Sequence, residues 1–523
     1  MGFESLRARH VLFWLLAAVS AALRAAAFFR YRFDSDEPQH LHVAWGWTAG
    51  LLPYRDFFDN HAPLFHIATA PILRAVGERE DVLLFMRAPM LVLFAVMIWA
   101  TYVLGRRLYD AEVGRWAAVM LSLLPPFFLK SLEYRTDNLW VALWMIAVVV
   151  LTGGSFKILR AFAVGVILGF AMATSMKTSL LLITLGIAGI TTIVMKRRRD
   201  GARPAAGTAA RLAALLIGAG IVPSIVALYF VRHGAWDALV YCNFVFNQGI
   251  GATRTAAAVW GPRIAWIPLM IIALRIAWRY RGARADRFFW AVATAVFFLT
   301  LGGFWILISP RDYLPFLPMI AIFAVAAIGQ RTWIYAALAL LFVAFIAKEM
   351  RGFRDQTGEE ITMIRQVLRL TRPGDYLMDI KGETIFRQRP SYHIFEFITR
   401  NQILRGMIAD TVPEDVVARR CYAAQADGEF WPPRARAFLS ANFLDLGRLR
   451  AAGQWIKADG SFTIAVPGEY VIVSRNGVVH GPAALAAGPH RFGRANSGER
   501  LAVVWAPAIE RGLSPFRLQD RDF

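Results

Sequence analysis

The sequence predicts a polytopic α-helical membrane protein with about eleven transmembrane helices, followed by a mixed α/β domain. Of the 523 residues, 57% are hydrophobic, and Phe and Trp occur 38 and 17 times. The mean hydropathy is +0.45. Apolar runs long enough to cross a bilayer, about 17–25 residues each, recur up to residue 347. Beyond that point polar residues and turn signals interrupt the apolar runs.

The apolar runs define a membrane domain over residues 1–347. The first run could also be a cleavable signal peptide. It lacks an A-x-A cleavage pattern before the next polar loop, and Arg24 and Arg30 flank its end, so we expect a retained first span. The predicted spans are 11–29, 82–104, 116–129, 138–152, 161–175, 178–195, 212–231, 263–278, 288–308, 313–329 and 332–347.

The net charge of +21 belongs mostly to the membrane domain. Up to residue 347 there are 33 Lys and Arg against 17 Asp and Glu, and after it 25 against 20. With the N-terminus inside, the basic residues fall mainly in the inner loops, as the positive-inside rule describes. This bias explains the charge without nucleic acid as a partner. Together with the count of eleven spans, it places the first polar loop and the C-terminal domain on the outer face of the membrane.

Residues 348–523 are expected to form a soluble extracytoplasmic domain, and about 170 residues are ample for a separate core. A polar linker at 351–360 precedes an apolar period of helical type at 361–368, which ends at the turn signal 371–374. Strands are predicted at 469–473 and 501–505. The two cysteines, Cys242 and Cys421, are both predicted outside. They could pair, but two free thiols are the favoured alternative.

The first polar loop, residues 30–66, holds the most informative cluster. Asp34-Ser35-Asp36-Glu37 is followed by His40 and His42, directly after the first span. Charged groups beside a bilayer are costly, which makes such a cluster a candidate functional site. Asp36 or Glu37 could instead only cap a helix that begins at Pro38. The two histidines are more often stacked or hydrogen-bonded than bound to metal.

A second run in the same loop, Pro53 to Phe65, is polar, aromatic and punctuated by proline. It contributes Asp56 and His61. Its aromatic side chains are equally suited to anchoring at the membrane interface and to stacking on a sugar; they are Tyr54, Phe57 and Phe58.

The first loop also offers a weak metal motif. Asp34-Ser35-Asp36 spells D-x-D, whose hard oxygens suit Mg²⁺ or Mn²⁺. Three residues are too short a pattern to establish a site, so the sequence implies no cofactor and leaves a divalent metal (Mg²⁺ or Mn²⁺) as an alternative.

Later outer loops carry cations that run against the topology bias. Arg135 stands beside Asp137 and could pair with it. Lys177 and Arg311 could snorkel to lipid headgroups or bind a phosphate. Arg254 is a further cation of the outer loops. Carboxylates together with cations at a membrane surface suit transfer of a group from a lipid phosphate. Cations would stabilise the leaving phosphate, and a carboxylate would deprotonate the acceptor hydroxyl.

At this point the chain resembles the GT-C class of polytopic glycosyltransferases. A hydrophobic span followed at once by Asp36-Glu37 is similar to the branch that includes protein O-mannosyltransferases and aminoarabinose transferases (glycosyltransferase family 39-like). Three further stretches look like bacterial members: Gly50 to Phe58, His61 to Phe65 and Arg311 to Pro318. The resemblance covers residues 1–347 and gives no expectation for the C-terminal domain.

The resemblance implies an inverting transfer of a sugar from a polyprenyl-phosphate donor to an envelope acceptor, namely a protein, lipopolysaccharide or another glycan. Asp36 would be the general base, and Glu37 would orient it or the acceptor. Lys177 and Arg311, with Arg135, would hold the donor phosphate. This branch generally works without a metal. Further candidate substrate contacts are His40, Tyr54, Asp56, His61 and Asp137.

Two other classes of function stay open. A transporter or lipid-sugar flippase would place ionisable or helix-breaking residues near the middle of several spans, whereas the charges here gather at one face. A catalytically inactive scaffold is the third alternative, and the intact pair Asp36-Glu37 argues against it.

Overall fold

The computed structural model describes residues 3–200, 207–248, 260–261, 264, 267–280, 284–305, 308–426, 428, 430–493 and 499–516. The chain divides into two compact units. The first, the membrane unit, comprises Met1–Arg32, His61–Phe65 and Met86–Gln356. The second, the mixed unit, comprises Phe33–Asn60, His66–Phe85 and Thr357–Phe523.

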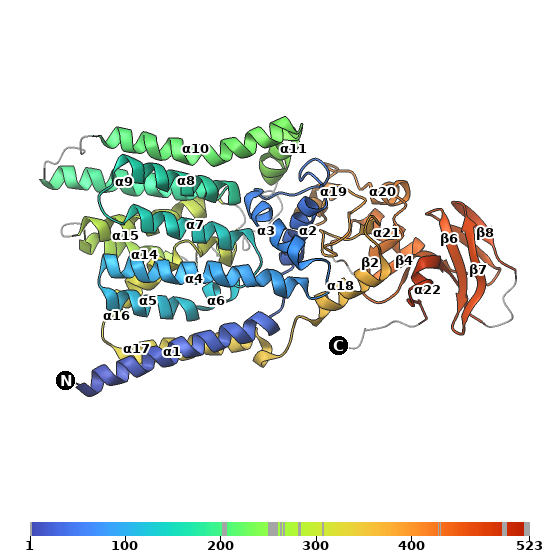
Figure 1. Ribbon diagram of the computed structural model, residues 1–523, viewed down its shortest axis with the longest axis horizontal. Helices are drawn as coiled ribbons and strands as arrows, with labels where there is room; N and C mark the ends of the chain where they lie inside the picture. Colours follow the sequence, from blue (N-terminus) through green and yellow to red (C-terminus); the bar gives the residue numbers. More distant parts are fainter. Residues whose placement is uncertain are drawn as a thin grey trace. The chain divides into compact units, whose positions relative to one another are not determined.

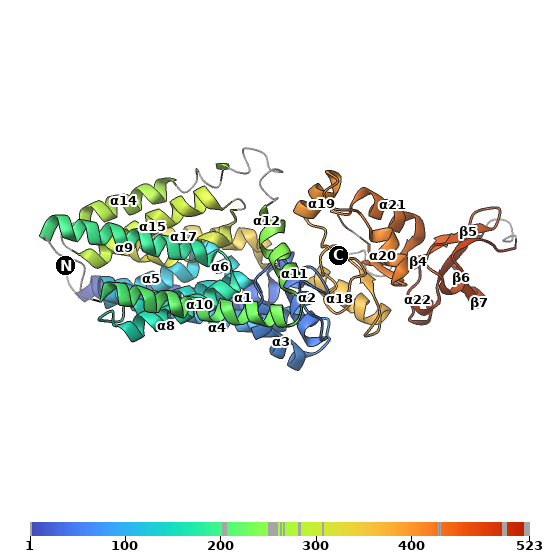
Figure 2. The same ribbon diagram turned by 90° about the horizontal axis from the view of Figure 1, so that it is seen from above.

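The membrane unit is built from long apolar helices that run roughly parallel to one another (Figures 1 and 2). Within the described ranges, six helices are long and apolar enough to cross a membrane, and several shorter apolar helices accompany them. The predicted polytopic fold is confirmed. The helices are α1 (Phe3–Arg30), α4 (Val82–Leu108), α5 (Ala111–Leu123), α6 (Pro125–Lys130), α7 (Thr136–Leu151), α8 (Ile158–Thr174), α9 (Thr178–Asp200), α10 (Thr208–Arg232), α14 (Ile267–Tyr280), α15 (Ala285–Phe304), α16 (Leu317–Ile328) and α17 (Thr332–Glu349).

One predicted span is divided in the structure. The run 116–129 falls on two helices, α5 and α6, because Leu124 is extended and Pro125 begins a new helix. Proline has no amide N–H to continue the first helix, and it favours an extended residue before it. Short elements join the longer helices: α11 (Trp236–Val240), the π-helix η1 (Tyr241–Val245), α12 (Phe246–Gln248), and the 3-10 helices η3 (Pro310–Tyr313) and η4 (Arg351–Phe353).

Two helix pairs in the membrane unit approach closely at glycines. Helix α8 packs on α10, and a Cβ atom at Gly169 would lie 2.9 Å from the carbonyl oxygen of Ala219. A Cβ atom at Gly218 would lie 2.5 Å from the carbonyl oxygen of Phe162. Where α4 faces α5, a Cβ atom at Gly105 would lie 2.7 Å from the Cα atom of Gly114. Small residues at such crossings let two membrane helices pack backbone to backbone.

The mixed unit combines two helices from the first polar loop with the C-terminal residues. Helix α2 (Asp36–Thr48) begins at the acidic cluster, and α3 (Leu64–Val76) begins at the end of the loop. The sequence predicts an active-site loop over residues 30–66, whereas the structure makes much of this segment helical. Nine residues of α2 are buried, both polar and apolar. A helix buried on most sides lacks the apolar stripe that reveals a surface helix in a sequence.

The C-terminal part of the mixed unit contains a seven-stranded sheet with the order β1-β2-β4-β9-β6-β7, in which β3 also pairs with β4. The pairing of β1 with β2 is parallel and the other pairs are antiparallel. A separate two-stranded sheet joins β5 to β8. The strands are β1 (Leu377–Met378), β2 (Ala423–Gln425), β3 (Phe443–Asp445), β4 (Leu449–Trp455), β5 (Ser461–Ile464), β6 (Gly468–Ser474), β7 (Gly477–Leu485), β8 (Gly488–Arg491) and β9 (Ala502–Trp505).

Helices accompany this sheet, and the predicted elements are confirmed here. The predicted helix over 361–368 is α18, and the two predicted strands are β6 and β9. Cys242 and Cys421 are both buried. The helices are α18 (Gly358–Leu370), α19 (Phe397–Leu404), α20 (Val412–Ala418), α21 (Pro433–Asn442) and α22 (Ala506–Glu510).

Candidate active site

The acidic cluster forms the first turn of α2. Asp36 and Glu37 occupy this turn, where negative charge interacts favourably with the helix dipole. Glu37 is fully buried, and its Oε1 accepts a hydrogen bond of 2.8 Å from the backbone N–H of Asp34. The Oδ1 of Asp34 accepts one of 3.3 Å from the N–H of Asp36. Two of the three carboxylates therefore bind backbone within the turn, whereas the side chain of Asp36 stays 29% exposed.

Asp36 forms an ion pair within the mixed unit. The Nζ atom of Lys381 lies 2.6 Å from Asp36 Oδ1 and donates a second hydrogen bond of 3.1 Å to Ser35 Oγ. Lys381 itself is only 8% exposed. The lysine follows Asp36 by 345 positions, and nothing in the sequence around it indicated this contact.

The histidines of α2 make hydrogen bonds and ring contacts. His40 Nδ1 lies 3.0 Å from His66 Nε2, and His66 Nδ1 lies 3.7 Å from Asp59 Oδ2. These three side chains are fully buried or nearly so. His42 Nδ1 lies 2.8 Å from the carbonyl oxygen of Ile385, and burial lowers the pKa of His42. We did not predict a role for His66 or Asp59, because their contacts join separate parts of the first loop.

The second run of the first loop is mostly buried. Tyr54, Phe57 and Phe58 are at most 7% exposed and pack inside the mixed unit, and the hydroxyl of Tyr392 donates to the carbonyl oxygen of Tyr54. Asp56 closes a turn by accepting a 2.7 Å hydrogen bond from the N–H of Leu52. It also pairs with Arg55 at 2.8 Å, and this hydrogen bond holds the pKa of Asp56 below its usual range.

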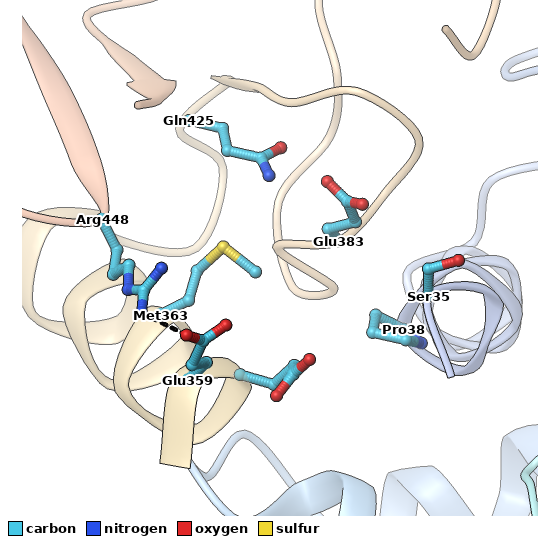
Figure 3. A pocket seen from close by; sticks show the side chains of 8 residues that line it. Ser35, Pro38, Glu359, Met363, Glu383, Gln425 and Arg448 are labelled. Atoms are coloured by element: carbon cyan, nitrogen blue, oxygen red, sulfur yellow. Dashed lines mark ion pairs between the residues drawn. The ribbon is translucent and has the colours of Figure 1, made fainter. Parts of the chain in front are cut away.

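A polar pocket of about 170 Å³ lies beside the first turn of α2 within the mixed unit (Figure 3). Glu359 on α18 pairs with Arg448 at 3.1 Å. Glu383 projects from the loop that carries Lys381, and burial together with the nearby Asp379 raises the pKa of Glu383 to about 7. The lining residues are Ser35, Pro38, Glu359, Glu360, Met363, Glu383, Gln425 and Arg448.

The membrane unit contains a second group of charges, in which Lys177 is held by two carboxylates. Its Nζ atom lies 2.9 Å from Asp137 Oδ1 and 2.5 Å from Asp312 Oδ1. Burial lowers the pKa of Lys177, but the two carboxylates raise it by more, so its pKa lies above the usual value. Arg135 pairs with Asp137 at 3.4 Å, as the pairing alternative predicted.

Arg311 belongs to the same group and pairs with Glu133 at 2.7 Å. Glu133 also accepts from Lys130 at 2.7 Å and is almost fully buried. The group thus contains four cations and three carboxylates, so one positive charge is in excess. We define these seven residues as the cationic cluster: Lys130, Glu133, Arg135, Asp137, Lys177, Arg311 and Asp312.

Local structure explains how the cationic cluster is held. The side chain of Asn138 donates to the carbonyl oxygens of Lys130 and Glu133, at 3.2 and 2.7 Å, and so fixes the turn between α6 and α7. Asp312 closes the turn of η3 through its Oδ2, which accepts from the N–H of Ser309 at 2.6 Å. His61 lies in the membrane unit and is partly buried, whereas Arg254 falls outside the described residues.

Among the residues that the structure describes, no group of three or more His, Cys, Asp or Glu side chains is arranged to hold a metal ion. Asp34 is the first residue of the D-x-D motif, and its Oδ1 accepts a hydrogen bond from the backbone N–H of Asp36.

The fold, a polytopic helical membrane domain followed along the chain by a mixed domain, is similar to that of solved GT-C glycosyltransferases. The predicted resemblance is thereby confirmed at the level of the fold. In particular, the structure is similar to ArnT from Cupriavidus metallidurans bound to undecaprenyl phosphate, with a TM-score of 0.58 and 11% identity, over 84% of this chain and 97% of that chain. The apo state of the same protein gives a TM-score of 0.56 at 13% identity, with the same coverage of both chains.

A weaker likeness joins this chain to the Archaeoglobus fulgidus oligosaccharyltransferase tethered with an acceptor peptide. The TM-score is 0.45 at 10% identity, over 91% of this chain and 74% of that chain. No known family model matches the sequence, and no curated protein matches it.

Proposed function

We propose that this protein is a membrane glycosyltransferase that moves a sugar from a polyprenyl-phosphate donor to a hydroxyl group of an envelope acceptor. One observation carries the proposal. In a chain with the GT-C fold, Asp36 is a partly exposed carboxylate at the start of α2, while Asp34 and Glu37 beside it bind backbone. Support for the donor comes from the ArnT structure, which is bound to undecaprenyl phosphate.

In the proposed reaction, Asp36 removes the proton from the acceptor hydroxyl as its oxygen attacks the anomeric carbon of the donor sugar. The bond from that carbon to the phosphate oxygen breaks, and the polyprenyl phosphate leaves with the electron pair. Attack from the side opposite the leaving group inverts the anomeric centre. A positioned general base of this kind contributes about 10²–10⁴-fold to the rate.

The cationic cluster suits the donor phosphate because it combines an excess positive charge with rigid placement. Lys177 and Arg311 are each held by carboxylates at 2.9 Å or less. Fixed cations stabilise a leaving phosphate without having to reorganise during the reaction. Glu37 and Asp34 support the turn that presents Asp36. The polar pocket beside Ser35 is the proposed position for the acceptor, because its carboxylates and amide can bind sugar hydroxyls.

The test uses membranes from cells that make the protein, because these supply the native acceptors. Polyprenyl-phosphate sugars with a radiolabelled sugar are added, and label transferred into the non-lipid envelope fraction is measured. D36N should abolish transfer while the protein accumulates normally. The matched control D237N, at an exposed position on α11, should transfer as the wild type does.

Two outcomes would contradict the proposal. An active D36N protein would remove Asp36 from the role of base. A flippase would be supported instead if the reconstituted protein moved the labelled lipid across the vesicle bilayer and transferred no sugar. Mass spectrometry of envelope glycans, with and without the protein, would identify the sugar and the acceptor.

A further inference from the structure

The loop that carries Lys381 lies within the C-terminal part of the chain and contacts α2 of the same unit. We define the Asp379 loop as residues 379–389. Its lysine binds both Asp36 Oδ1, at 2.6 Å, and Ser35 Oγ, at 3.1 Å. The polar pocket begins beside this contact, because Ser35 and Glu383 both line it. A basic side chain therefore reaches the proposed general base from a domain that the family resemblance did not cover.

The conformation of the Asp379 loop is fixed from within by its first residue. Asp379 is fully buried, and its carboxylate accepts from the backbone N–H groups of Gly382 and Thr384, at 2.8 and 2.9 Å. It also accepts from the Thr384 hydroxyl at 2.7 Å and from Arg389 Nε at 2.8 Å. A buried carboxylate with four such partners holds the intervening backbone, and thus the base of the Lys381 side chain, in one place.

The loop is also fitted closely against α2. Gly382 has a φ of +91°, and a Cβ atom there would lie 2.7 Å from the ring of His42. The neighbouring Ile385 has a φ of +60°, a conformation that is an outlier for a β-branched residue, and its carbonyl oxygen lies 2.8 Å from His42 Nδ1. Such strain persists only where the surrounding structure imposes it, and it clusters at functional sites.

We propose that Lys381 is a positioning residue for Asp36, delivered to the general base by the Asp379 loop. This inference rests on the proposed function and goes beyond it, because it makes the C-terminal domain part of the catalytic apparatus. The ammonium group holds one carboxylate oxygen of Asp36 and favours the ionised form that a base requires. An ion pair between two exposed side chains adds little to stability. In the pair of Lys381 with Asp36, the lysine is mostly buried and its backbone is held by the Asp379 loop.

The experiment compares K381M, K381R and K457M in the membrane transfer assay over a range of pH. Lys457 is an exposed lysine of the same domain and serves as the matched control. K381M should lower kcat about 10- to 100-fold, the scale expected when a catalytic group is misplaced by about 1 Å, with the KM for the donor unchanged. K381R should recover much of the rate, and K457M should behave as the wild type.

The pH profile separates positioning from simple loss of structure. A carboxylate that loses its paired cation takes up a proton more readily, so the acid limb of the K381M profile should move to higher pH. Lys381 contacts Asp36 on α2 and lies near Glu383, which also lies near Asp379 and Arg389 of the same loop. E383Q is therefore measured in parallel, and it should leave the acid limb in place.

Each remaining outcome decides the question. Wild-type activity of K381M, or a lowered rate with an unmoved acid limb, would overturn the inference. If D36N is active, the proposed function fails instead, whatever K381M does. K381Q, whose shorter side chain keeps a hydrogen-bond donor but no charge, replaces K381M if that variant does not accumulate, and the same criteria apply to it.

Discussion

Replacing Lys177 by methionine gives the sharpest test of the cationic cluster. The ammonium group lies 2.9 Å from Asp137 and 2.5 Å from Asp312, whose side chains are only 5% and 1% exposed. Methionine fills a similar volume but leaves two buried carboxylates facing each other. Asp137 keeps Arg135 at 3.4 Å, a longer contact than the one it loses.

The expected loss of stability follows from this geometry. Removing one partner of a buried ion pair costs about 3–5 kcal/mol, because the other charge remains buried and uncompensated. K177M should therefore lower the temperature at which the detergent-solubilised protein leaves the monodisperse peak in size-exclusion chromatography. The double variant K177M/D312N removes one of the two carboxylate charges and should recover roughly half of the loss.

The control for this series is K157M, at an exposed lysine that precedes α8, and it should melt as the wild type does. The reasoning is refuted if K177M keeps the wild-type melting temperature. It is also refuted if K177M/D312N is less stable than K177M. Neutralising a buried carboxylate that has lost its cation is expected to stabilise the protein.

Three further predictions concern the mixed unit. Because the pKa of Glu383 is raised to about 7 from an ordinary 4.5, its contribution to stability is fully present below about pH 4.5 and is lost as pH rises through 7. E383Q should flatten the decline of the melting temperature over this pH range. An unchanged decline would contradict the raised pKa of Glu383. G382A should lower transfer and stability together, since its Cβ would strike the ring of His42, and a fully active G382A would show that the loop can move. Cys421 should react with a maleimide only after unfolding, because burial raises the pKa of its thiol to about 12; labelling of the native protein at neutral pH would contradict this.

The membrane fold could be predicted because its signal is local. Each long apolar run had to become a helix, since a helix satisfies the backbone within the segment itself. The break at Pro125 and the burial of α2 were missed for different reasons. Hydropathy averages over a proline, and a helix that is buried on several faces has no single apolar stripe.

The candidate site could be predicted only in part. Asp36 was recognisable because it follows a membrane span directly, and a charge there needs a reason. Its partner Lys381 stands 345 residues away, and Glu133 is separated from Arg311 by 178. Contacts of this kind depend on tertiary structure, and one sequence holds no pattern that reveals them. For Lys177 and Arg311 the sequence predicts contacts with lipid headgroups or with a phosphate. Neither prediction includes the carboxylate partners that the structure shows.

The close approach of α8 to α10 at Gly169 and Gly218 has a consequence for how this chain could change over evolutionary time. These contacts involve no side-chain chemistry, and a single added methyl group would push the two backbones apart. Assembly of this helix pair is therefore insulated from any drift in the reactive residues. Replacement of either glycine by a larger residue is therefore expected to give a temperature-sensitive protein, independently of any change in the reactive residues.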